Sequence, residues 1–138
     1  MAAVPRSLTH ESLAAGVRAL ARRDRDFAVL YRRNGLPPMW ARRPGFPTMV
    51  HIVLEQQVSI IAARSLFRRV SAALGGMTPE RVLERGAAGL HALGLTRQKA
   101  SYCHALAAAV LDGSLSLAGV ARADDAEGRG VLLALRGI

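Results

Sequence analysis

The longest stretch of helical periodicity in the sequence runs over residues 47–74 and carries two adjacent amides, Gln56 and Gln57, near its middle. Apolar residues recur along it at spacings of three, four or seven and predict one buried stripe: Met49, Val53, Ile60, Ala63, Phe67, Val70 and Leu74. A buried amide without a partner costs about 1–3 kcal/mol, so a helix with one buried face has no local use for two of them. Because Ser59 can cap a new helix, we expect the segment to break between Gln56 and Ile60.

Capping residues, prolines and glycines divide the rest of the sequence into further helices. Thr78-Pro79 is the clearest start, because it places a side-chain cap and a proline before an apolar periodic stretch. Asp24 begins a helix that Gly35 ends as a left-handed C-cap, and Asp124 or Asp125 caps the final one. We expect helices at about 9–22, 24–34, 47–74 with its break, 78–85, 87–93, 96–111 and 124–135.

The composition favours helices over sheets. Hydrophobic residues make up 51% of the 138 residues, whereas aromatic residues make up only 4%. A core of Leu, Val, Ile and Ala suits packed helices, and no segment shows the alternation of a strand. The sequence therefore predicts one all-α domain, an orthogonal helical array with short connections.

The charge predicts an anionic partner. The formal net charge is +9 and the sequence pI is near 11.5, which favours nucleic acid over a merely basic surface. Of the 19 basic residues, 18 are arginine and one, Lys99, is lysine.

Neither a metal nor a cofactor is expected. The single cysteine, Cys103, excludes an internal disulfide and a paired-cysteine metal site. The four histidines have no ligand spacing: His10, His51, His91 and His104. No signal peptide or membrane span is apparent, so we expect a location in the reducing cytoplasm.

Three segments resemble, in order, a family of DNA repair enzymes. They are residues 45–46 (GF) leading to 54–59 (LEQQVS) and 62–64 (AAR), then 93–100 (LGLTRQKA), then 132–138 (LLALRGI). Together they resemble the 3-methyladenine DNA glycosylase II family of the helix-hairpin-helix glycosylase superfamily. The resemblance implies DNA base-excision repair, with hydrolysis of the N-glycosidic bond of alkylated purines in double-stranded DNA. It also implies N-terminal helices and a loop at 1–45, followed by part of a helical barrel at 46–138.

The same resemblance gives the glutamines different roles. In the family, the position of Gln57 supplies the wedge that enters the duplex where the damaged nucleotide has been flipped out. A side chain that fills this gap offsets part of the stacking free energy lost on flipping. Gln56 is then structural, tying the helix to a neighbouring loop, and Ser59 caps the next helix. In the alternative interpretation, both amides only satisfy backbone groups at the helix break.

Two further places are candidate phosphate contacts. Thr96, Arg97 and Lys99 put a cap and two cations at a helix N-terminus, where backbone N–H groups also converge. The alternative is a solvated charged face. Gly137 lies in Leu135-Arg136-Gly137-Ile138, which resembles the first half of the family's hairpin, whose backbone N–H groups hold a DNA phosphate.

The resemblance does not supply a catalytic residue. The family's hairpin continues past this point, and its catalytic Asp follows downstream. In this sequence Arg136 stands in the usual proline position and nothing follows Ile138. The aspartates that are present lie at expected helix ends and are interpreted as caps: Asp24, Asp26, Asp112, Asp124 and Asp125. We therefore expect a domain incomplete at its C-terminus and without activity of its own.

Two other expectations remain open. One is a small non-catalytic all-α DNA-binding module, in which residues 75–78 form the turn of a helix-turn-helix and 78–85 enter the major groove. The other is self-association through exposed apolar helix stripes, formed by Leu13, Val17 and Leu20 and by Leu132, Leu133 and Leu135.

Overall fold

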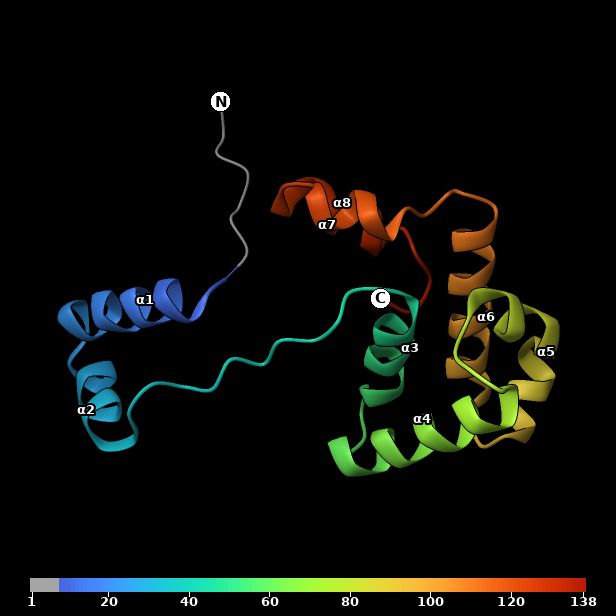
Figure 1. Cartoon of the computed structure of the whole chain (residues 1–138), viewed down its shortest axis with the longest axis horizontal. Coiled ribbons are helices and arrows are strands. Elements are labelled where there is room, and N and C mark those ends of the chain that lie inside the picture. The colour runs from blue at the N-terminus through green and yellow to red at the C-terminus, as the bar shows by residue number, and fades with distance from the viewer. Residues whose placement is uncertain (1–7) are drawn as a thin grey trace. The chain divides into compact units, whose positions relative to one another are not determined.

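The computed structural model of the chain describes residues 8–138, and these residues form helices without strands (Figure 1). The helices are α1 (His10–Arg23), α2 (Arg25–Asn34), α3 (Phe46–Glu55), α4 (Ile60–Leu74), α5 (Pro79–Ala92), α6 (Arg97–Leu111), α7 (Leu117–Arg122) and α8 (Asp125–Leu133). The predicted all-α class is confirmed. Within this part of the chain, none of the helices combines the length and hydropathy that crossing a bilayer requires.

The chain divides into two compact units. The first ends at Arg42 and contains α1 and α2, and the second comprises Arg43–Ile138. In the first unit α1 and α2 pack on each other. They leave an apolar groove of about 510 Å³ whose lining includes Leu13, Val17, Leu20, Phe27 and Leu30. Of the expected stripes, Leu20 and Leu133 are exposed, while Leu13, Val17, Leu132 and Leu135 are half-buried.

The second unit contains the hydrophobic core. Helix α3 packs against α4 and α6, α5 packs against α6 and α4, and α7 packs against α8. The largest fully buried side chains are Leu54, Leu90, Val50, Val53, Val70, Val82 and Cys103. They come from α3, α4, α5 and α6, so these four helices enclose the core that positions the turn between α3 and α4.

Side-chain caps explain most of the helix starts. An oxygen at each of seven N-caps accepts a backbone N–H of the first turn: Thr9, Asp24, Ser59, Thr78, Thr96, Ser116 and Asp124. Such a cap contributes about 1 kcal/mol to helix stability. Helix α3 has no side-chain cap and instead begins with Pro47 in its first turn, where the missing N–H costs nothing.

The predicted break in the long apolar segment is confirmed, because α3 ends at Glu55 and α4 begins at Ile60. The predicted burial of Ile60 is wrong: it is 62% exposed. The turn resets the helical phase, so spacings counted across it place Ile60 on the wrong face. The rest of the predicted stripe is buried or half-buried.

Other helix boundaries differ in detail. Helix α5 is interrupted at Gly86, with φ 71° and ψ 162°, where two helices had been predicted. Gly35 ends α2 with a positive φ of 73°, but its ψ of −155° is not left-handed helical. Helix α7 was not predicted, because its six residues are too few to show a period. Helix α8 ends at Leu133, two residues before the expected end.

The buried thiol of Cys103 gives a test of the core. Burial raises the pKa of this thiol to about 12, and the charge of Lys99 opposes the shift only in part. Because the thiolate is the reactive species, we expect no reaction with a disulfide reagent in mildly alkaline native buffer and one equivalent after denaturation. The absorbance of the thiol released from the reagent measures the reaction in the native and in the denatured protein. Rapid stoichiometric reaction of the native protein would show that α6 does not bury this face.

Candidate nucleic-acid interface

The turn between α3 and α4, residues 56–59, presents Gln57 to solvent. Gln57 has a φ of 59° and is the one non-glycine residue with a positive φ in the described part of the chain. This conformation costs an L-residue about 1–2 kcal/mol. It persists only where the surroundings determine it, and such strained residues cluster at functional sites.

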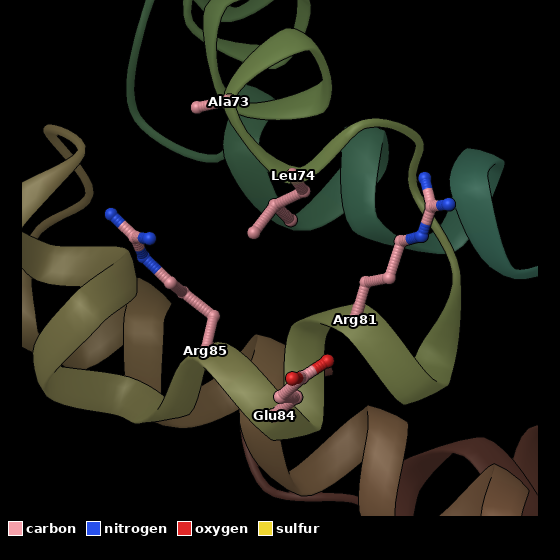
Figure 2. Close-up of a pocket in the computed structure, with 5 residues that line it drawn as sticks. All are labelled: Ala73, Leu74, Arg81, Glu84 and Arg85. Carbon is pink, nitrogen blue, oxygen red and sulfur yellow. The ribbon is translucent and has the colours of Figure 1, made fainter.

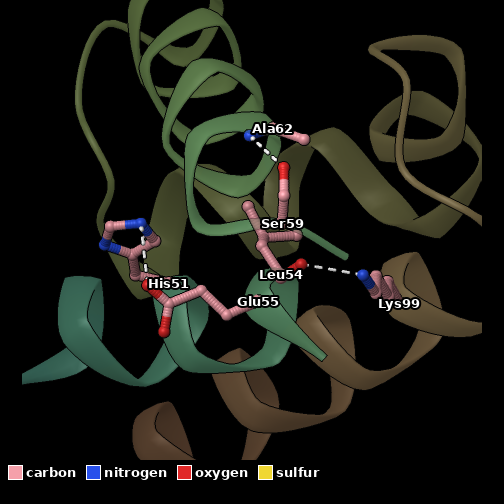
Figure 3. Close-up of polar contacts among 6 residues, drawn as sticks. All are labelled: His51, Leu54, Glu55, Ser59, Ala62 and Lys99. Carbon is pink, nitrogen blue, oxygen red and sulfur yellow. Dashed lines mark hydrogen bonds and ion pairs between the residues drawn. The ribbon is translucent and has the colours of Figure 1, made fainter. Parts of the chain in front are cut away.

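Lys99 closes the end of α3 (Figure 3). Its Nζ donates a hydrogen bond of 2.7 Å to the carbonyl oxygen of Leu54. The last four carbonyls of a helix lack an intrahelical partner, and a cation is favourable there. Lys99 comes from the first turn of α6, so this bond fixes the start of α6 beside the end of α3.

Gln56 ties the turn to the C-terminal segment. Its Nε2 donates to the carbonyl oxygen of Gly137 at 2.9 Å, across 81 positions of sequence. Gly137 has a φ of 100°, and a Cβ there would overlap the ring of Tyr102. Tyr102 in turn accepts a hydrogen bond of 2.6 Å from Gln98 Nε2. Only glycine fits between this ring and the turn without displacing one of them.

Three contacts brace the ends of α3 and α4 that flank the turn. The ring of His51, on α3, stacks on Phe67 of α4 with centroids 4.8 Å apart, and its Nε2 lies 3.6 Å from Glu55 Oε1. Ser59 Oγ accepts the backbone N–H of Ala62 at 3.1 Å and so begins α4 (Figure 3). These contacts hold the two helix ends on either side of Gln57.

The N-terminus of α6 supplies the second candidate contact. Thr96 Oγ1 accepts the backbone N–H of Lys99 at 3.1 Å, while Thr96 and Arg97 are exposed. The backbone N–H groups of Arg97 and Gln98 lie in the first turn, where a helix offers no acceptor. The ammonium of Lys99 points instead to the Leu54 carbonyl, so Arg97 is the side chain of this turn most open to an anion.

The structure thus gathers most of the predicted site residues around one turn. Hydrogen bonds bring Gln56, Lys99 and Gly137 together beside Gln57, and Thr96 and Arg97 begin the helix that carries Lys99. Tyr102 belongs to this arrangement but was not among the predicted site residues. Its signal was present, because Tyr102 follows Lys99 by three positions and shares its face of α6.

Three aspartates of the described residues are engaged away from this turn. Asp24 and Asp124 accept backbone N–H groups at the starts of α2 and α8, and Asp112 accepts the N–H of Ser114 at 2.8 Å. Glu55 lies at the turn, but its carboxylate faces His51. Within residues 8–138, no three His, Cys, Asp or Glu side chains lie close enough to hold a metal ion.

A basic hollow lies at the far end of α4 from the Gln57 turn (Figure 2). It has a volume of about 350 Å³ and is lined by Ala73, Leu74, Arg81, Glu84 and Arg85. Arg81 folds back over the glycine turn, since a Cβ on Gly76 would lie 2.9 Å from its Nη1. The regular helix stops at Gly86, and Glu84 places a negative charge beside the two guanidinium groups. The helix-turn-helix alternative would therefore have about two turns of regular helix to present to a groove.

Residues 50–138 match the model of the HhH-GPD superfamily base excision DNA repair proteins. No functionally characterised protein matches significantly by sequence.

Two solved structures share the fold. A DNA-3-methyladenine glycosidase from Bacillus halodurans superposes with a TM-score of 0.74 at 24% identity, over 97% of this chain and 62% of that one. A 3-methyladenine DNA-glycosylase from Archaeoglobus fulgidus gives 0.67 at 19% identity, over 96% and 54%. The chain therefore spans 54–62% of the length of these two structures.

The family match covers well over half of the chain and contains the Gln57 turn, the start of α6 and Gly137. The all-α fold agrees with it. The chain belongs to the HhH-GPD superfamily of base excision DNA repair proteins.

Proposed function

We propose that this chain is the DNA-positioning part of an alkylpurine DNA glycosylase of the 3-methyladenine type. Its partner is double-stranded DNA with an alkylated base, and the reaction of the whole protein is hydrolysis of the N-glycosidic bond of that base. The proposal is supported by the family match and by the two similar structures, both named for 3-methyladenine. It assigns to the described residues the holding of DNA rather than the cleavage of the bond.

The observation that carries the proposal is the left-handed, exposed Gln57 on a turn held from three sides. Flipping a nucleotide out of the duplex costs a few kcal/mol of stacking and pairing, and a side chain filling the gap recovers part of it. Such a side chain must be rigidly placed before it meets DNA, because ordering it on binding would cost free energy. In addition, a glutamine amide can hydrogen-bond the base left without a partner.

The phosphate contacts in the proposal come from backbone and side-chain groups on both sides of this turn. The N-terminus of α6 offers N–H groups and Arg97, and the Gly137 segment lies against Gln56. Gln56, Ser59 and Lys99 act as supports, because each has a polar partner within the protein. The net charge of +9 adds attraction that does not depend on sequence.

Replacing Gln57 tests the wedge directly. We expect Gln57→Ala to lower affinity for a duplex with an abasic-site analogue about tenfold, equivalent to about 1.4 kcal/mol, with little effect on an intact duplex. Fluorescence anisotropy with both duplexes measures the preference. Unchanged preference for the abasic duplex in the alanine variant would contradict the role of Gln57.

Gln57→Gly is the matched variant for backbone strain. Glycine adopts a positive φ without steric cost, so this variant should melt at a higher temperature than the wild type while losing the same DNA preference. A variant that melts lower would mean that the Gln57 side chain stabilises the turn itself.

Arg97 and Lys99 form a second pair of variants with opposite expectations. Arg97→Met should weaken binding to any duplex and reduce the slope of log affinity against log salt by about one. Lys99→Met should keep that slope but lower the melting temperature, because the Leu54 carbonyl loses its partner. Salt titrations and thermal melts separate the two effects, and the reverse result would exchange the two roles.

Self-association through the apolar groove of α1 and α2 is a further part of the proposal. The groove exposes Leu20, Phe27 and Leu30, an apolar surface of a kind that partners often cover. Sedimentation velocity should detect oligomers that Phe27→Ser weakens and that Leu111→Ser, at the end of α6 and outside both apolar stripes, leaves intact. A monomer at all accessible concentrations would remove this part of the proposal.

A further inference from the structure

The first turn of α4 places apolar side chains where an amphipathic helix has polar ones. Ile61 is 82% exposed, Ile60 is 62% exposed, and Val58 in the preceding turn is 47% exposed. Ala63 and Val70 mark the buried face of α4. Ile61 precedes Ala63 by two residues, or roughly 200° around the helix axis, so its side chain points away from the core.

The same outer face becomes basic one turn later. Arg64 and Arg68 follow Ile61 by three and seven residues, which places all three on one side of the helix, and both arginines are exposed. Arg68 lies about 10 Å along the helix axis from Ile61 at about 1.5 Å per residue. Helix α4, Ile60–Leu74, contains no acidic residue.

An apolar side chain followed by two arginines along one helix face suits a DNA groove better than a protein surface. Apolar side chains that enter DNA pack between or against base steps and kink the duplex, whereas arginines along the same element contact the phosphates. The apolar end of the face adjoins Gln57, and the basic part extends away from it. The surface is thus continuous with the interface proposed above.

We propose that Ile61 is a second wedge contact, whose side chain enters the minor groove beside Gln57 and packs against the base step next to the flipped nucleotide. Arg64 and Arg68 then bind phosphates along the same groove. This inference rests on the proposed function and adds to it a residue that fixes where along the duplex the kink forms. It also explains why a largely exposed isoleucine occupies the first turn of a solvent-facing helix surface.

The test compares Ile61→Ser with Leu111→Ser, which removes an exposed apolar side chain at the far end of α6. Binding is measured to a duplex with an abasic-site analogue flanked by 2-aminopurine, whose fluorescence rises when it is unstacked. We expect Ile61→Ser to lower the affinity about tenfold and to reduce the fluorescence rise, while Leu111→Ser changes neither. Ile61→Leu should restore both, and Arg64→Met and Arg68→Met should each reduce the salt slope by about one.

The outcomes separate this inference from the function on which it rests. If Gln57→Ala loses the abasic preference and Ile61→Ser behaves as wild type, Ile61 is not a wedge contact and the proposed function stands. If neither variant changes binding or fluorescence, the proposed function fails as well. If Ile61→Ser abolishes self-association in sedimentation and leaves DNA binding unchanged, the face is a protein interface and the inference is overturned. Thermal melts check folding, and Ile61→Ala serves as a second variant should the serine variant melt lower.

Discussion

The end of α3 is the constraint on which the rest of the site depends. Leu54 is fully buried, so its carbonyl, left over at the helix end, has little access to water. An unpaired carbonyl in this position would cost about 1–3 kcal/mol. The ammonium of Lys99 supplies the partner from 45 residues away, and the chain can then turn sharply into α4 with Gln57 at the tip.

The contacts that hold this turn come from distant parts of the second unit. Gln56 reaches Gly137, and His51 stacks on Phe67 of the next helix. The strain of a left-handed glutamine is therefore balanced by the packing of the unit as a whole. The stability of the unit and the conformation of the turn are consequently coupled, because a loss of core packing would release the turn.

The sequence was sufficient for the features that depend on local chemistry. Caps such as Thr78 and Thr96 act within their own first turn, so the starts of α5 and α6 follow from a few neighbouring residues. The break after Glu55 was likewise predicted from a cap, because Ser59 can begin a new helix. Helix α7, in contrast, has too few residues to show a period, and Ile60 was misplaced because the turn resets the phase.

Only part of the candidate site could be predicted from the sequence. The roles of Gln57 and Gly137 came from a resemblance, and that of Arg97 came from its place at a helix N-terminus. The partner of Lys99, in contrast, depends on how α6 lies against α3. No pattern within either helix specifies that contact. The close approach of Gly137 to the Tyr102 ring could not be predicted for the same reason, because it joins segments that are far apart in the sequence.

The extreme use of arginine has a consequence for chemical labelling. Lys99 is the sole lysine and Cys103, one helical turn later, is the sole cysteine. A reagent for side-chain amines therefore has one target on α6, Lys99 at the Gln57 turn. A reagent for thiols also has one target on α6, Cys103 in the core. Acylation of Lys99 requires the local opening of that turn, whereas modification of Cys103 requires exposure of the core. The rates of Lys99 acylation and Cys103 modification, both measured on the protein without substitutions, would distinguish loosening of the turn from unfolding of the unit.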